Sequence, residues 1–245
     1  MNRTSITGLA CLLAVALTAC AGGGEPPAPS GSPAPAPLEA LKEPANSMSV
    51  SPPLSPAPVS AEALAAYRAL LAGEPGALDR PPEGLELHQV TLPPAEELEY
   101  VLLDLDGDGG AELVVQMVEQ PQQFNAVFHY GDGELSCWQY DIVEMSCRDY
   151  PLEDGAMVRQ YDTGTGPNRY SNLYTVFRYL PDGETEECAS LAVHQDTQED
   201  GTEVFTYLVD DAEVDQDTFA AEFEELVGSR LLSLEDWIPA TERPG

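Results

Sequence analysis

The sequence predicts a β-rich α+β domain, an antiparallel β-meander of about eight short strands flanked by an N-terminal and a C-terminal helix. Two observations favour this class. Apolar residues follow helical spacing in two stretches, one near each end of the domain. Between these stretches, short runs rich in β-branched and aromatic residues alternate with Gly, Asp and Pro. Because such close turns join neighbouring strands, we expect the strands to pair in chain order.

Each predicted helix has a capping residue, an apolar face and a terminating glycine. Ser60 caps the first helix, residues 61–72, and Gly73 ends it. Asp215 caps the second helix, and Gly228 ends it. The apolar faces comprise Leu64, Tyr67, Leu70 and Leu71 in the first helix, and Phe219, Phe223, Leu226 and Val227 in the second. We expect the two helices to cover one face of the sheet.

The predicted strands are short apolar runs bounded by turn residues. Gly131-Asp132-Gly133 and Pro181-Asp182-Gly183 are typical of hairpin turns. Strands are predicted at residues 99–103, 113–118, 125–130, 134–141, 156–161, 173–179, 188–194 and 203–209.

The segment between the first two predicted strands has aspartates at every second position, followed by or separated by glycines. Loops that hold Ca²⁺ supply oxygen ligands from their first, third and fifth positions and a backbone carbonyl from the seventh. Residues 104–110 match this order, and Gly109 falls at the sixth position, where the chain must turn sharply. The alternative is a glycine-rich turn whose carboxylates face water, which repulsion between close aspartates disfavours. The spacing predicts a Ca²⁺ site formed by Asp104, Asp106, Asp108, Gly110 and Glu112.

The pattern Asp-x-Asp-x-Asp-Gly-x-x-Glu-Leu at residues 104–113 resembles the calcium loops of FG-GAP and VCBS-type repeats and of uncharacterised bacterial surface lipoproteins. It occurs once, whereas a β-propeller would repeat it in several blades. The resemblance implies a strand-loop-strand site that Glu112 closes. An EF-hand is excluded, because its twelfth position requires a bidentate Glu and that position is Val115.

The N-terminus has the features of an export signal. Residues 1–19 contain Arg3 and an apolar run that is shorter than the roughly 20 residues a membrane-spanning helix needs. The following Leu17-Thr18-Ala19-Cys20 resembles the lipobox of bacterial lipoproteins. The resemblance implies cleavage before Cys20, lipidation of that residue, and an extracytoplasmic location in which the lipid anchors the chain to the bacterial cell membrane.

Composition divides the rest of the chain into a tether and one domain. Residues 20–59 consist mostly of Pro, Ala, Ser, Gly and Glu, which bury too little apolar surface to offset the entropy of ordering. We expect a disordered tether there and a single globular calcium-binding domain over residues 60–245.

The formal net charge of −33 excludes nucleic acid as a partner. It disfavours docking on anionic lipid, so the expected membrane contact is the lipid anchor alone. A protein, peptide or glycan ligand is expected, and its identity is not encoded in any motif. The acidity would attract basic partners, but a solvated acidic surface that keeps the protein in solution is the favoured interpretation.

Three cysteines remain once the signal peptide and Cys20 are set aside. A disulfide between Cys137 and Cys147 would close a short loop between a strand and its return. Pairing of either residue with Cys188 and three reduced thiols are the alternatives.

The sequence assigns no catalytic residue. Asp162-Thr163-Gly164 matches the core motif of aspartic proteases, but it occurs once, and the polar Arg159 and Gln160 precede it where that family has an apolar strand. Residues 164–167 are therefore predicted to form a turn.

The three histidines, His88, His129 and His194, lack the spacing of a zinc site. Together these features predict a lipid-anchored, calcium-binding cell-surface module that acts in binding or scaffolding. The alternative is a secreted hydrolase, of the aspartic or carboxylate-pair type, on the same domain.

Overall fold

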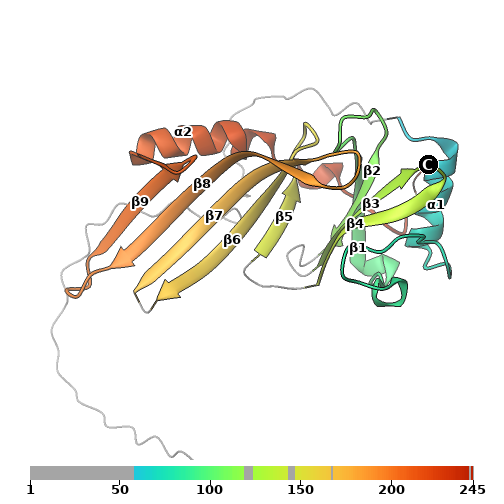
Figure 1. Ribbon diagram of the computed structural model, residues 1–245, viewed down its shortest axis with the longest axis horizontal. Helices are drawn as coiled ribbons and strands as arrows, with labels where there is room; N and C mark the ends of the chain where they lie inside the picture. The colour runs from blue at the N-terminus through green and yellow to red at the C-terminus, as the bar shows by residue number, and fades with distance from the viewer. Residues whose placement is uncertain (1–57, 119–123, 143–146, 167, 243, 245) are drawn as a thin grey trace, which may run out of the picture. The chain divides into compact units, whose positions relative to one another are not determined.

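The computed structural model describes residues 58–118, 124–142, 147–166, 168–242 and 244 (Figure 1). It confirms the predicted class: the domain is β-rich α+β, with two antiparallel sheets, an N-terminal helix and a C-terminal helix. The predicted signal peptide, Cys20 and nearly all of the predicted tether lie outside the described residues. No helix within the described ranges is long and apolar enough to cross a membrane.

The first sheet has five strands in the order β11-β1-β2-β3-β4, so its four long strands pair in chain order as predicted. The C-terminal β11 adds to the outer edge of β1, where Tyr100 pairs with Ile238. The strands are β1 (Leu98–Leu103), β2 (Glu112–Met117), β3 (Phe124–Gly131), β4 (Glu134–Ile142) and β11 (Ile238–Pro239).

The second sheet has six strands in the order β10-β9-β8-β7-β6-β5, again with neighbours in sequence paired. Its strands are β5 (Cys147–Pro151), β6 (Met157–Gly166), β7 (Arg169–Tyr179), β8 (Thr185–Thr197), β9 (Glu203–Val209) and β10 (Ala212–Val214). Short 3₁₀ helices at Leu87–Gln89, Ala95–Glu97, Gly228–Arg230 and Leu234–Asp236 lie in the connections.

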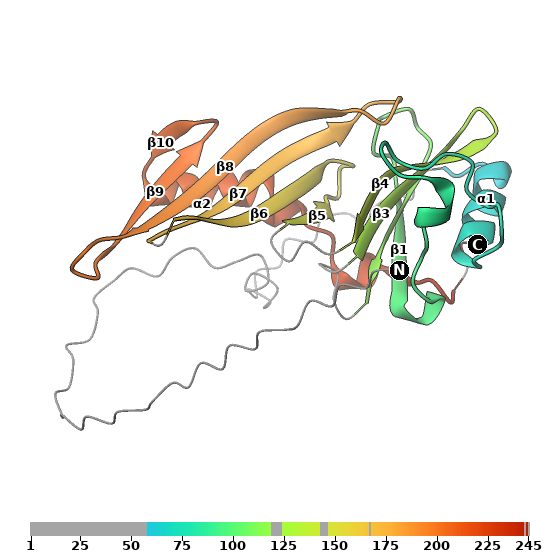
Figure 2. The same ribbon diagram turned by 60° about the horizontal axis from the view of Figure 1, so that its bottom comes forward.

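Both helices form where their caps predict. In α1 (Ala61–Leu71), the Ser60 side chain accepts a hydrogen bond from the backbone N–H of Ala63. In α2 (Gln216–Leu226), Asp215 accepts one from Thr218. The expectation that both helices cover one face is wrong, because α1 packs in the core of the first sheet and α2 in that of the second. Figures 1 and 2 show α2 lying along a face of the second sheet.

Three strands of the second sheet are longer than predicted, and residues 164–166, predicted to lie in a turn, belong to β6 instead, whereas Pro167 lies outside the described residues. β6 continues to Gly166 and pairs with β7 through Arg169 and Tyr170, with a bulge after Gly164. The extension of β6 is polar and glycine-rich. Its backbone hydrogen bonds to β7 continue although the alternation of apolar residues has ended. These residues lack the alternating apolar pattern from which a strand is predicted, so the sequence did not indicate the extension.

A third apolar cluster joins the two sheets. Leu103, Leu105 and Val127 from the first sheet and its loop pack with Met157 and Phe177 from the second. Trp138 of β4 stacks between His129 of β3, 4.3 Å away between ring centroids, and Tyr179 of β7, 5.2 Å away. The loop after β1 is thereby anchored at the junction between the sheets.

A buried polar network lies at the same junction. Arg159 of β6 donates two hydrogen bonds, of 2.9 and 2.7 Å, to the carboxylate of Asp149 in β5. The Asp149 side chain is fully buried. Gln139 of β4 donates to the same carboxylate and accepts a 2.6 Å bond from the Tyr179 hydroxyl. Because buried charges are costly unless paired, this network makes the junction sensitive to the loss of one member.

Candidate metal centre

The acidic loop connects β1 to β2, whose pairing brings Leu103 opposite Glu112 at its base. Gly107 and Gly109 have φ angles of +77° and +88°, a conformation that other residues adopt only at a cost. These two glycines turn their N–H groups toward Asp104, whose two carboxylate oxygens accept bonds of 2.8 and 3.1 Å from them. The glycines therefore fold the loop around its first carboxylate.

The next two aspartates are held in the same way. Asp106 Oδ1 accepts from the Asp108 N–H at 3.0 Å, and Asp108 Oδ1 accepts from the Gly110 N–H at 2.5 Å. A carboxylate oxygen has more than one lone pair, so these bonds leave acceptor capacity on every aspartate. The loop thus orders three carboxylates without using up their ability to bind a cation.

Three contacts fix the loop to the domain. Leu105 is fully buried, whereas Asp104 and Asp106 on either side of it are half-buried. The Tyr67 hydroxyl of α1 donates a 2.8 Å hydrogen bond to the Ala111 carbonyl. Gly155, in the β5–β6 turn, lies so close to the Asp104 carbonyl that a Cβ atom there would be 2.1 Å from the oxygen. The position of the loop consequently depends on α1 and on both sheets.

The side chains around the loop form two groups that could hold a metal ion, and the groups share Asp106. Ligand atoms of Asp104, Asp106 and Asp108 lie within 4.8 Å of one another, as do those of Asp106, Glu112 and His129. Of the five ligands predicted from the sequence, the structure gathers the three aspartates in one group and places Glu112 in the other. Gly110, predicted to supply a carbonyl ligand, donates its backbone N–H to the Asp108 carboxylate.

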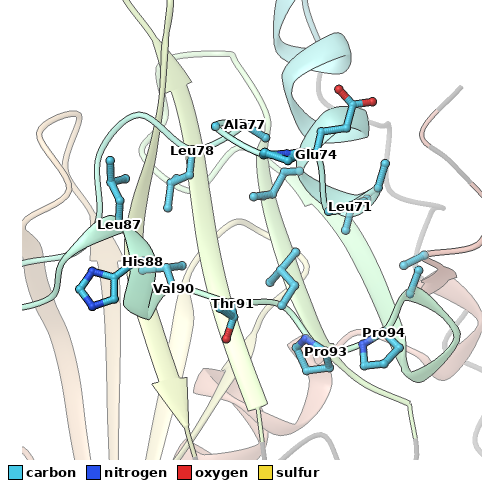
Figure 3. Close-up of a pocket in the computed structure, with 18 of the residues that line it drawn as sticks. Leu71, Glu74, Ala77, Leu78, Leu87, His88, Val90, Thr91, Pro93 and Pro94 are labelled. Carbon is cyan, nitrogen blue, oxygen red and sulfur yellow. The ribbon is translucent and has the colours of Figure 1, made fainter.

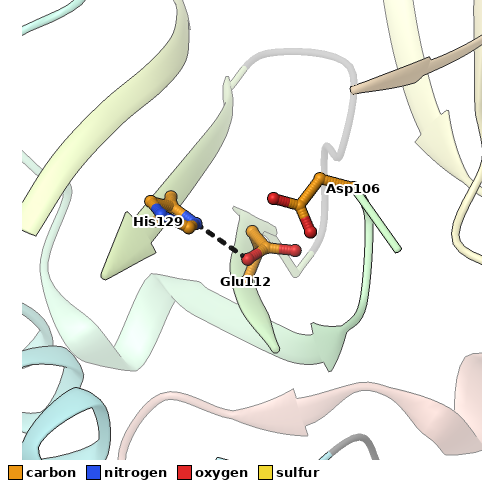
Figure 4. A group of neighbouring side chains, drawn as sticks. All are labelled: Asp106, Glu112 and His129. Carbon is orange, nitrogen blue, oxygen red and sulfur yellow. Dashed lines mark hydrogen bonds and ion pairs between the residues drawn. The ribbon is translucent and has the colours of Figure 1, made fainter. Parts of the chain in front are cut away.

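Glu112 is the most buried acid of the site, with 2% of its side chain exposed. Its Oε2 accepts a 2.8 Å bond from the Leu105 N–H, and its Oε1 lies 3.0 Å from His129 Nδ1 (Figure 4). Burial raises the pKa of Glu112, although the bond to His129 opposes this rise. Burial alone would lower the pKa of His129, but the hydrogen bond and the charge of Glu112 raise it.

His129 was missed because its partners are distant in sequence. The β2–β3 register pairs Leu113 with Phe128, which brings the preceding Glu112 and the following His129 side by side. The strands predicted at residues 113–118 and 125–130 lie close to β2 and β3, but the prediction of two strands does not by itself give the register between them. The pairing register would have been the signal that identified His129.

Electrostatics favour a cation at Asp106, the residue that belongs to both groups. Burial raises the pKa of Asp106, and the charges of Asp108 and Asp104 raise it further. Its Oδ2 is buried and accepts no hydrogen bond from any described residue. A buried acceptor without a partner is costly, and a divalent ion would satisfy it while relieving the repulsion among the acids. The residues therefore fit a metal ion.

The other sequence-predicted positions lie away from this site. Cys137 is buried in β4 and Cys147 begins β5, so the two belong to different sheets. Their disulfide stays a prediction, and lipidation of Cys20 concerns a residue outside the described ranges. Asp162 lies within β6, where its carboxylate accepts a hydrogen bond from Gln160.

One serine and one histidine approach each other as in nucleophilic catalysis. Ser171 Oγ lies 2.7 Å from His194 Nδ1, across the β7–β8 pair. Only 2% of Ser171 is exposed, whereas an attacking hydroxyl must reach its substrate. We interpret this contact as a cross-strand hydrogen bond that satisfies a buried serine.

Two cavities lie on the first sheet and its helix. A cavity of about 450 Å³ adjoins the acidic loop and is lined in part by Asp108, Glu112 and His129. A groove of about 1060 Å³ lies between the end of α1 and residues 87–96 (Figure 3). Its lining is largely apolar, with Leu71, Leu78 and Val90 among its side chains, and its polar groups do not converge on one point.

Comparisons of this chain with family models, with curated proteins and with solved structures returned no match.

Proposed function

We propose that the protein is a lipid-anchored, calcium-binding module of the bacterial cell surface that acts by binding or scaffolding. The observation that carries the proposal is the convergence of the Asp104, Asp106 and Asp108 carboxylates in a loop built around two left-handed glycines. Calcium prefers such an all-oxygen shell and tolerates irregular geometry, whereas Mg²⁺ takes fewer protein ligands and keeps its waters.

Glu112 and the Gly110 carbonyl complete the proposed shell. The likeness of residues 104–113 to the calcium loops of FG-GAP and VCBS-type repeats supports this ligand order. Glu112 follows the loop as the first residue of β2, so an ion bound there would tie the loop to the sheet. The proposed role of the ion is to brace a loop between two strands and not to fold the whole domain.

We expect millimolar Ca²⁺ to raise the melting temperature of the purified protein. Extracellular calcium modules bind with dissociation constants of about 10⁻⁴ to 10⁻³ M, so linkage contributes about 1 kcal/mol near millimolar calcium. For a domain of this size, the corresponding shift is about 2 to 4 °C. Asp106→Ala is expected to abolish the shift, as followed by circular dichroism.

Asp200→Ala is the matched control, because it removes one exposed aspartate that caps a hairpin turn remote from the loop. It should retain the calcium response of the wild type. An identical melting curve with calcium and with chelator in the wild type would refute the calcium proposal.

The anchor rests on the lipobox-like Leu17-Thr18-Ala19-Cys20. Cys20→Ser removes the thiol that would carry the lipid, so we expect the variant to leave the membrane fraction. Fractionation of cells that express each form measures this. Retention of the variant in membranes at the wild-type level would disprove the anchor and leave the metal site unaffected.

The proposed binding role rests on the charge of the chain, whose formal net value is −33. The strong negative charge favours a partner with a basic surface, such as a protein, a peptide or a cationic glycan, over nucleic acid.

A further inference from the structure

We propose that Asp106, Glu112 and His129 form a second metal site that takes a divalent transition ion such as Zn²⁺. The site shares Asp106 and Glu112 with the proposed calcium shell, so zinc is titrated in calcium-free buffer, but it differs in chemistry because one ligand is an imidazole nitrogen. Imidazole suits zinc and its neighbours in the first transition row, whereas calcium binds oxygen ligands. The proposal stands whether or not the loop binds calcium.

The geometry of the buried pair supports a shared ion. Zinc lies about 2.0 to 2.2 Å from histidine nitrogen and carboxylate oxygen, so two ligands of one zinc are about 3.0 to 3.5 Å apart. His129 Nδ1 and Glu112 Oε1 are 3.0 Å apart, and the third ligand atom, from Asp106, lies within 4.8 Å of both. Figure 4 shows the three side chains grouped together. Small side-chain movements would bring all three onto one ion.

An oxygen without a partner points to the same ligand. Asp106 Oδ2 is buried and accepts no hydrogen bond from the described residues, although Oδ1 is bonded to the Asp108 N–H. A bound cation would supply the missing partner for this oxygen. The adjoining cavity of about 450 Å³, lined in part by Glu112 and His129, leaves room for the ion and for waters that complete its coordination.

The ligands are held in place by neighbours that do not touch the ion. The Leu105 N–H bonds Glu112 Oε2 at 2.8 Å and leaves Oε1 facing His129. The His129 ring stacks on Trp138 at an interplanar angle of 10°, and its Nε2 edge lies against Gly131, where a Cβ would approach to 2.4 Å. Such outer contacts orient metal ligands, and their loss commonly weakens binding by about 10- to 100-fold.

Calorimetric titration of the purified protein with ZnCl₂ tests the proposal. The wild type is expected to bind one zinc ion, and His129→Gln to bind it at least about tenfold more weakly. Gly131→Ala, which retains all three ligands but crowds the histidine ring, should also weaken zinc. Asp108→Ala is the matched control, since it removes an aspartate of the other group and should lose the calcium response while retaining zinc.

Cobalt provides a readout that a folding defect would not imitate. Because Trp138 stacks on His129, bound Co²⁺ is expected to quench tryptophan fluorescence in the wild type and to quench it much less in folded His129→Gln, which retains both tryptophans. Absence of zinc binding in the wild type, or equal zinc affinity in the wild type and in folded His129→Gln and Gly131→Ala, would overturn the proposal. Loss of the calcium response alone would overturn the calcium loop and not this site.

Discussion

Arg159→Met is expected to lower the free energy of unfolding by about 3 kcal/mol, because it leaves the buried Asp149 carboxylate without its counter-charge. Asp149 has a fully buried side chain and loses two charge-assisted hydrogen bonds from the guanidinium. The value is at the lower end for breaking a buried ion pair, because the Arg159 side chain is 46% exposed. Urea unfolding followed by tryptophan fluorescence measures it.

Arg169→Met is the matched control, because the same change is made at an exposed pair. Arg169 and Asp196 are separated by 3.8 Å, and both side chains are more than one third exposed. Pairs of this kind contribute about 0 to 1 kcal/mol. Equal destabilisation by the two variants would contradict the importance of the buried network for the junction.

Gly155→Ala is expected to destabilise the domain by about 3 kcal/mol and to weaken calcium binding at the loop. Gly155 has a φ of +80°, which a Cβ makes unfavourable by about 1 kcal/mol. The Cβ would also lie 2.1 Å from the Asp104 carbonyl oxygen, so one of the two backbones must move. Movement at Asp104 displaces the first ligand of the proposed shell.

Gly201→Ala separates these two contributions. Gly201 has a similar φ of +83°, but a Cβ there meets no atom within 4 Å. This variant should be destabilised by about 1 kcal/mol and retain its full calcium response, as measured by melting curves with calcium and with chelator. A Gly155→Ala protein that behaves like Gly201→Ala would show that the turn does not support the loop.

Local signals predicted much of the fold. Ser60 and Asp215 cap the two helices as expected, and the strand predicted at 203–209 has the bounds of β9. These features depend on a few neighbouring residues, such as a side-chain oxygen close to an unpaired N–H. Helix starts and apolar strands are therefore accessible from sequence alone.

The division into two sheets was not accessible in this way. It depends on contacts between residues far apart in sequence, such as Leu105 with Met157 and Phe177 in the junction cluster. Three strands were not predicted: β5, β10 and β11, which have five, three and two residues, too few for a clear periodic pattern. Their pairing is decided by the neighbouring strand and not by their own composition.

The candidate site shows the same limit. Alternating aspartates and glycines identified the loop, because calcium ligands follow a fixed local spacing. His129 has no such spacing to Glu112, and only the β2–β3 register brings it 3.0 Å from that carboxylate. Ligands supplied by one loop can be predicted from sequence, whereas ligands supplied across a sheet require the structure.

A crystal structure of the protein grown with calcium tests the central claim most directly. The account predicts density for one ion among Asp104, Asp106 and Asp108, with oxygen atoms at about 2.3 to 2.6 Å. Water alone between these carboxylates, at calcium concentrations well above millimolar, would contradict it.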